Sequence, residues 1–166
     1  MSTALGRAIY NRLTGVEVLT GSARATQLAL AALLGSVQGK PAVFHGNRSD
    51  LPSVPFPCIT YRFQAGLDDK LWAGVSMKRP SVAIEIWDNG RTSNVISDIA
   101  DLMEQLLNSS LLTAPPLPIN AINANEWVFW MDIQTPLNTI YDERVHEWAG
   151  TLLYEVQHMK FFTPVV

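Results

Sequence analysis

The stretch from Ser81 to Leu107 constrains the fold more than any other part of the sequence. Residues Ser81 to Trp87 alternate between two sets of side chains, with Val82, Ile84 and Ile86 in one set. This period of two is typical of a strand with one buried face. A turn signal, Asp88-Asn89-Gly90, follows the strand. The next residues, Asn94 to Leu107, carry apolar side chains at helical spacing: Val95, Ile96, Ile99, Leu102, Met103, Leu106 and Leu107. A strand followed by an amphipathic helix predicts a sheet with a helix packed on one face.

Two further helices are predicted near the N-terminus. The first covers Thr3 to Leu13 and places Leu5, Ile9 and Leu13 on one apolar face. The second covers Ala23 to Leu34, a stretch rich in alanine and leucine, with Ser22 as the expected N-cap.

The remaining strands follow from short runs of β-branched and aromatic residues. They are expected at Ala42 to His45, Cys58 to Phe63, Trp127 to Gln134 and Arg144 to Lys160. Gly150, inside the last of these, predicts a bulge or a bend. The segments between strands are read as an excursion at Gln64 to Lys78, a connection at Asn138 to Glu143, and proline-containing loops before Cys58 and at Asn108 to Asn125. The order α-α-β-β-β-α-β-β predicts one α+β domain over residues 1–166, with a mainly antiparallel sheet and two or three helices on one face.

Composition excludes several classes of protein. The 166 residues are 48% apolar and carry a net charge of −3, so the chain resembles neither a disordered segment nor a basic nucleic-acid binder. A single cysteine, Cys58, allows no intrachain disulfide. No apolar run is long enough to span a bilayer, and the first residues lack the layout of a signal peptide, so we expect no membrane association.

The sequence contains no recognisable catalytic or metal-binding motif. His45, His146 and His158 lack partners at metal-ligand spacing, and the glycines do not form a phosphate-binding loop. Cys58 is expected to be a buried structural residue, because no activating base lies near it in sequence. The pairs Asp68-Asp69 and Asp142-Glu143 are expected to be solvated charges, because neighbouring residues of a strand point to opposite faces. We therefore predict a protein that is not an enzyme and that needs no cofactor.

The aromatic residues are more informative about function than the absence of catalytic motifs. Trp127, Phe129, Trp130 and Met131 fall within one predicted strand, so large apolar side chains occupy both of its faces. One face can pack on the helices. The other is covered either by a loop of the same chain or by another subunit, and the sequence supports both alternatives about equally. The segment Leu67 to Met77 adds apolar residues to a charged surrounding, which is typical of a loop that is tucked down or inserted into a neighbour.

The layout of the chain resembles that of the tail-terminator, or tail-completion, proteins of long-tailed bacteriophages. The resemblance covers about residues 4 to 160. It is carried by the segments AIYNRLTG, DLPSVPFPCITYRF, VAIEIWDNGRTSNVISDIADLMEQLL and YDERVHEWAGTLLYEVQ. The sequence departs from the family pattern at residues 20–39, which form an additional helical insertion.

This resemblance implies a structural role in the virion, at the tail or neck, after assembly in the host cytoplasm. Family members form rings, usually hexamers, that end growth of the tail tube and face the head connector. The implied partners are other copies of the chain, the tail tube protein, the head–tail connector or neck proteins, and the sheath terminus if the tail is contractile. DNA would pass through the ring without sequence-specific binding.

A head-to-tail ring needs two different complementary surfaces on each subunit. The apolar segment around Leu67 to Met77 and the C-terminal tail, residues 161–166, are the candidates in this sequence. The predicted contact residues are Leu67, Asp68, Asp69, Lys70, Leu71, Trp72, Val75, Met77, Lys78, Arg79, Phe161 and Phe162. The alternatives are another neck, connector or tube-interface protein and, from a different class, a small cytoplasmic enzyme or ligand-binding domain.

Overall fold

The computed structural model describes residues 3–51, 53–72, 75–108, 114, 115, 117 and 125–161. Within these residues, three helices, one short 3-10 helix and seven strands make up one α+β domain. In chain order they are α1 (Thr3–Thr14), α2 (Gly21–Leu33), β1 (Ser36–Val37), β2 (Lys40–Pro41), β3 (Val43–His45), η1 (Arg48–Asp50), β4 (Cys58–Trp72), β5 (Val75–Asp88), α3 (Asn94–Leu107), β6 (Glu126–Asp142) and β7 (Glu147–Phe161).

The main sheet has five strands in the order β3-β4-β5-β7-β6. Every neighbouring pair is antiparallel except β3 and β4, which run parallel. The two short strands β1 and β2 form a separate hairpin. The mainly antiparallel sheet predicted from the sequence is therefore confirmed.

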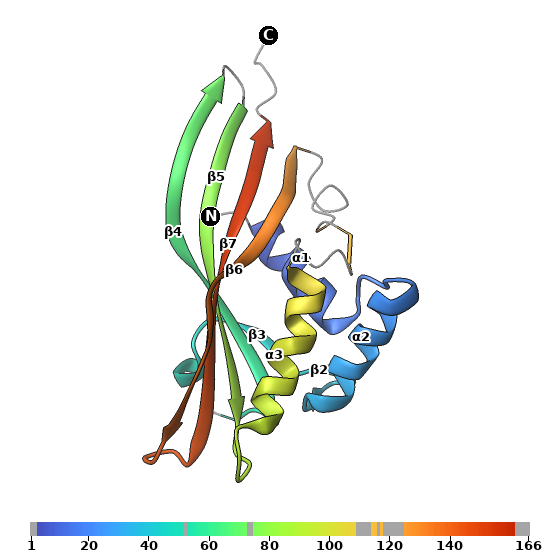
Figure 1. Ribbon diagram of the computed structural model, residues 1–166, viewed down its shortest axis with the longest axis vertical. Coiled ribbons are helices and arrows are strands. Elements are labelled where there is room, and N and C mark those ends of the chain that lie inside the picture. The colour runs from blue at the N-terminus through green and yellow to red at the C-terminus, as the bar shows by residue number, and fades with distance from the viewer. Residues whose placement is uncertain are drawn as a thin grey trace.

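All three helices lie on the same side of the strongly twisted sheet (Figure 1). α1 and α3 contact the strands, whereas α2 packs mainly on α3 and α1. The core fills the space between α1, α3 and the sheet. Its completely buried residues include Leu5 and Ile9 of α1, Ile84 of β5 and Met103 of α3. The predicted layering, with helices on one face, is confirmed.

The helices agree closely with the sequence periodicity. α3 spans Asn94–Leu107 as predicted, because its apolar stripe fits one face of a helix without interruption. α2, however, starts at Gly21 with Thr20 at the N-cap position, and neither Thr20 nor Ser93 before α3 makes a capping hydrogen bond through its side chain. The prediction that Ser22 caps α2 is wrong, because Ser22 already lies in the first turn. None of the helices in the described residues is long and apolar enough to cross a membrane.

The strands are longer than predicted. The excursion expected at Gln64 to Lys78 is wrong, because β4 runs to Trp72 and β5 begins at Val75. The two strands continue as a hairpin past the helices, at the top of Figure 1. The connection expected at Asn138 to Glu143 is also wrong over most of its length, since β6 continues to Asp142.

Gly150 lies in a regular part of β7, where it pairs with Ile86 and Thr139. The register of β7 does not shift there, so the predicted bulge is absent at Gly150. A Cβ atom at this position would overlap Cγ2 of Ile96 and lie 2.9 Å from Cδ1 of Leu137. Glycine is required because α3 approaches the sheet closely at this point.

A buried polar group ties α1 to the segments around it. The side chain of Arg12 is 2% exposed and pairs with Glu17 through two hydrogen bonds of 3.0 and 2.8 Å. It also donates to the carbonyl oxygens of Leu106, at the end of α3, and Pro115. A charge buried in this way is stable only when it is paired and hydrogen-bonded, as it is here.

Candidate interaction surface

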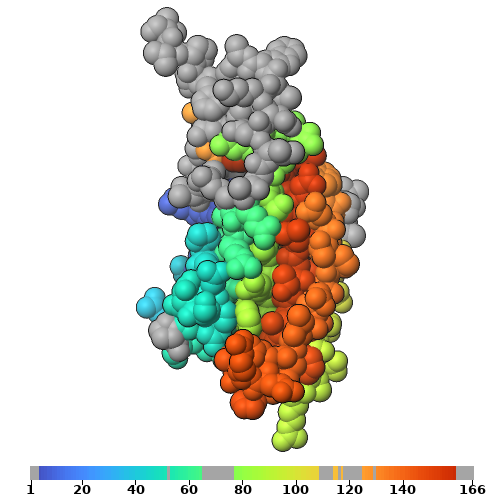
Figure 2. All heavy atoms as spheres, turned by 90° about the vertical axis from the view of Figure 1, so that its left-hand side faces the viewer, coloured from blue at the N-terminus to red at the C-terminus, as the bar shows by residue number. Residues whose placement is uncertain are grey.

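The face of the sheet opposite the helices is not covered by any of the three helices. Figure 2 views the molecule from that side and shows strands β4, β5, β7 and β6 next to one another with no helix over them. Along β7, Leu152, Tyr154 and Val156 are buried against the helices, whereas Thr151, next to Leu152 on the outer face, is exposed. We call this surface the outer face of the sheet.

The segment between β3 and β4 covers one end of the outer face. Arg48, in η1, reaches across to Glu147 of β7 with an Nη2–Oε1 distance of 2.8 Å. Cys58 lies beneath this end with no exposed surface, and burial raises the pKa of its thiol to about 12. The prediction that Cys58 is a buried structural residue is confirmed.

Next to this covered end, the outer face is hollowed into a groove of about 580 Å³. Segment 47–49 forms one wall, the turn between β6 and β7 forms the other, and β4 and β5 supply the floor. We call it the charged groove, and its lining residues are Asn47, Arg48, Ser49, Arg62, Glu85, Trp87, Asp142, Arg144, Val145 and Glu147.

Each of the three arginines in the charged groove pairs with a carboxylate. Besides the Arg48–Glu147 pair, Arg62 lies 3.1 Å from Glu85, and Arg144 lies 3.1 Å from Asp142. The side-chain hydrogen bond from Arg144 is the main reason that the pKa of Asp142 is lowered. The formal charges of the lining therefore cancel.

The arginine side chains of these pairs are more exposed to solvent than the carboxylates. The guanidinium side chains of Arg62 and Arg144 are 46% and 88% exposed, whereas their partners Glu85 and Asp142 are 15% and 31% exposed. Carboxylates lie beneath and guanidinium groups lie on top. A molecule entering the charged groove would therefore meet a mainly cationic surface with planar hydrogen-bond donors.

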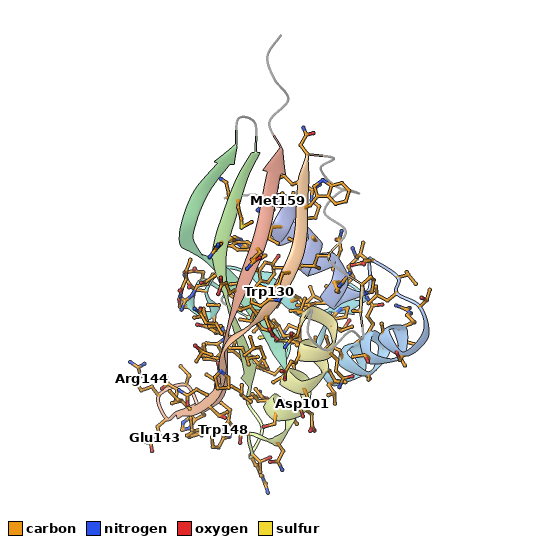
Figure 3. All side chains as sticks on the ribbon, turned by 45° about the horizontal axis from the view of Figure 1, so that its top comes forward. Asp101, Trp130, Glu143, Arg144, Trp148 and Met159 are labelled. Atoms are coloured by element: carbon orange, nitrogen blue, oxygen red, sulfur yellow. The ribbon has the colours of Figure 1, made fainter. Side chains whose placement is uncertain are left out.

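A second cluster lies at the other end of the outer face. Met77, Met159 and Trp127 are register partners across β5, β7 and β6, so they form one row on this face. Trp130 lies beside them, because a register shift between Val128 and Trp130 returns it to the same face while Met131 is buried in the core. Figure 3 labels Trp130 and Met159 on these strands. We call these four residues the Trp–Met patch.

The register shift divides the apolar residues of the strand Trp127 to Met131 between the two faces of the sheet. The register shift directs Val128 and Met131, which are 5% and 1% exposed, toward the helices. Trp127 remains 47% exposed on the outer face. Tryptophan and methionine are enriched at protein interfaces, so this patch has the composition of a contact surface.

The structure brings together only part of the predicted contact set. Leu67, Asp68, Asp69, Lys70, Leu71, Trp72 and Val75 belong to the β4–β5 hairpin, but their side chains lie outside the described part of the structure. Met77, Lys78 and Arg79 follow on β5. Phe161 ends β7 opposite Val75, with its side chain also outside the described part, and Phe162 is outside it altogether.

Sequence reasoning missed the charged groove. Its residues come from four segments far apart in the chain, and none of them forms a motif. A partial signal was the density of charge in the segment Asp142 to Glu147, which contains four of the ten lining residues.

The described residues contain no cluster of histidine, cysteine or acidic side chains able to hold a metal ion. His45 stacks near Tyr61 and Phe63, with ring centroids 5.3 and 5.8 Å away. His158 is buried and lies 2.9 Å from a carboxylate oxygen of Glu126. His146 is exposed in the turn between β6 and β7. The three histidines therefore lie apart, in different surroundings.

The fold as a whole is similar to that of a chain in a solved virion of a native gene transfer agent particle. The similarity has a TM-score of 0.56 at 13% sequence identity and covers 96% of this chain and 99% of the other. Sequence comparison gave no match to a protein-family model and none to a curated protein.

Proposed function

We propose that this chain is a structural subunit of the virion of a long-tailed bacteriophage or phage-like particle, and that it acts as a tail terminator. In this role, copies of the chain form a ring at the head-proximal end of the tail tube. The ring stops growth of the tube and joins the tail to the head connector. The role is one of assembly and involves neither catalysis nor a cofactor.

The observation that carries the proposal is the similarity in fold to a chain of the gene transfer agent virion. The similarity extends over nearly the full length of both chains, so it is not limited to a common sheet motif. Fold alone does not determine function, and the layout that resembles tail-completion proteins supplies the specific role.

The uncovered outer face supports a role in assembly. It carries the Trp–Met patch at one end and the charged groove at the other, and these two surfaces differ in chemistry. A head-to-tail ring requires two different, complementary surfaces on each subunit, and the outer face can supply one of them. In this proposal the β4–β5 hairpin, which continues past the helices (Figure 1), contacts the tube protein or the connector.

Incubation of the purified protein with polymerised tail tubes of the same particle tests the role. A tail terminator is expected to bind one end of each tube as a ring and to prevent further addition of tube protein, as seen by electron microscopy. Binding at the head connector but not at the tube end would instead assign the chain to another part of the neck. Failure to bind either component would refute the proposal.

A substitution in the Trp–Met patch supplies the matched test of the surface. Trp127→Ser should weaken assembly, because a large apolar side chain is lost at an exposed position. The control is Val18→Ser, which removes an apolar side chain that is 67% exposed in the link between α1 and α2. Equal assembly of both variants would show that the patch is not a contact surface.

A further inference from the structure

The charged groove on the outer face has a complementary surface elsewhere on the same molecule. α3 contains Asp98, Asp101 and Glu104 and no lysine or arginine. Asp98 and Asp101 are exposed, and Glu104 is half-buried. Residues three apart lie on neighbouring turns of a helix, so these carboxylates form one stripe along the exposed side of α3. We call it the acidic stripe.

The acidic stripe is not neutralised within the described residues. Neither Asp98, Asp101 nor Glu104 lies within ion-pair distance of a described lysine or arginine. This differs from the charged groove, where each carboxylate has an arginine partner. The stripe therefore presents uncompensated negative charge to solvent.

The two surfaces lie on opposite sides of one subunit. Figure 3 shows Arg144 on the turn between β6 and β7, and Asp101 on α3, away from that turn. α3 packs on the helix-covered face of the sheet, whereas the charged groove opens on the outer face. The groove and the stripe of one chain therefore cannot meet, but those of two neighbouring chains can.

We propose that the charged groove binds the acidic stripe of a second copy of this chain, and that this contact is one of the head-to-tail contacts of the ring. The exposed guanidinium groups of Arg62 and Arg144 face the carboxylates of Asp98 and Asp101 from the neighbour. Arginine suits such a contact, because its planar donors match the two oxygens of a carboxylate. The inference rests on the proposed ring, and it specifies which surfaces hold neighbouring subunits together.

The chemistry of the groove favours this occupant over an uncharged one. Arg144 keeps its bond to Asp142 while most of its side chain remains in solvent, so donors remain available for a second carboxylate. Val145 lines the groove and is 53% exposed, and Trp87 lies in its floor. These side chains supply apolar contact beside the charges, as in the core and rim of a protein interface. Glu143, next to Arg144, is not part of the lining.

Charge reversal on the two sides provides the test. Arg144→Glu and Asp101→Arg should each weaken association of the full chain by about tenfold or more, the size of loss expected when a charged contact becomes repulsive. The double variant Arg144→Glu with Asp101→Arg should recover association, because each interface again joins opposite charges. Lys40→Glu and Arg7→Glu reverse exposed charges outside both surfaces and serve as controls.

Association is measured by sedimentation or light scattering over a range of protein concentrations, with thermal unfolding to show that each variant is folded. Because Arg144 and Asp101 are both exposed, neither reversal should lower the melting temperature of the single chain appreciably. Wild-type association should weaken as salt rises from about 0.1 M to about 1 M, where the screening length falls from about 10 Å to about 3 Å.

The outcomes separate this inference from the proposed function. If the wild-type chain forms a ring and both single reversals form it equally well, the groove–stripe contact is refuted while the proposed function stands. Weakened single variants without recovery in the double variant would also refute the contact, because the two residues would then act at separate places. A wild-type chain that stays monomeric and does not bind tubes would refute the proposed function itself.

Discussion

Replacing Gly150 with alanine tests how tightly α3 packs against the sheet. The added Cβ would overlap Cγ2 of Ile96, a completely buried residue of α3, and lie 2.9 Å from Cδ1 of Leu137. Carbon atoms in contact prefer about 3.5–4.0 Å, so the helix or the strand has to shift. Cγ2 of Ile96 is fixed directly to a branched Cβ and cannot move away by rotation of a flexible end.

The expected cost follows from this geometry. Adding one methyl group to a well-packed core costs about 1–3 kcal/mol, and the double overlap places Gly150→Ala near the upper end of that range. For a domain of this size, 1 kcal/mol changes the melting temperature by about 2–4 °C. We therefore expect a melting temperature lowered by about 4–12 °C, measured by circular dichroism. Thr151→Ala, at the exposed neighbouring position of β7, serves as the control and should change it by less than about 4 °C.

A double-mutant cycle identifies the cause. Ile96→Ala removes the overlapped methyl group and by itself costs about 2–5 kcal/mol through the space it leaves. In the Gly150→Ala chain the new methyl group occupies part of that space, so the two losses should not add. Additivity within about 0.5 kcal/mol would refute the reasoning, because it would show that the two residues do not compete for the same volume.

Three further predictions concern the interior. Arg12→Met should lower the free energy of unfolding by about 3 kcal/mol in urea titration, because Glu17 and two carbonyl oxygens lose their donor; a change under 1 kcal/mol would contradict a structural role for this ion pair. Tyr61→Phe should cost about 1 kcal/mol through loss of the buried bond from its hydroxyl to the carbonyl oxygen of Gly6, 3.0 Å away, and no loss would show that the bond is unimportant. Burial raises the pKa of Cys58 from 9.0 to about 12. The contribution of the un-ionised thiol to stability is therefore fully present below pH 9. It falls as the pH rises from 9 toward 12, because in this range the thiol ionises in the unfolded chain but not in the folded one. Urea titrations should show that the free energy of unfolding falls less between pH 8 and pH 10.5 for Cys58→Ala than for the wild type. Equal losses in the two proteins would contradict the burial of an un-ionised thiol.

The parts of the fold that the sequence predicts best are those where one face meets the core. α3 begins and ends where its apolar period begins and ends, because each apolar residue of the stripe has a buried position to fill. The end of β4 after Phe63 and the start of β5 before Ser81 were not predicted. These parts extend past the helices, so their side chains need not alternate between apolar and polar. Cross-strand pairs such as Asp68 with Lys78 form part of their register, and a single-sequence pattern does not reveal such pairing.

The candidate surface was predictable only in part. The excess of aromatic residues at Trp127 to Met131 indicated an outward apolar cluster, but the register shift that sorts Trp130 from Met131 depends on pairing with β7. The charged groove gave almost no sequence signal, because Arg48, Arg62 and Arg144 become neighbours only when η1, β4 and the β6–β7 turn meet. Gly150 was predicted to mark a bulge or a bend. Its actual role could not be predicted, because the close approach of α3 is a property of packing rather than of local sequence.

The shape of the assembled protein tests the central proposal most directly. Electron microscopy of the purified chain, over a range of concentrations, should show closed rings with a central channel and about six subunits, the closed symmetry expected of a head-to-tail contact in a tail terminator. A protein that remains monomeric at every concentration, both alone and with tail tubes, would contradict the proposal that this chain is a ring-forming virion subunit.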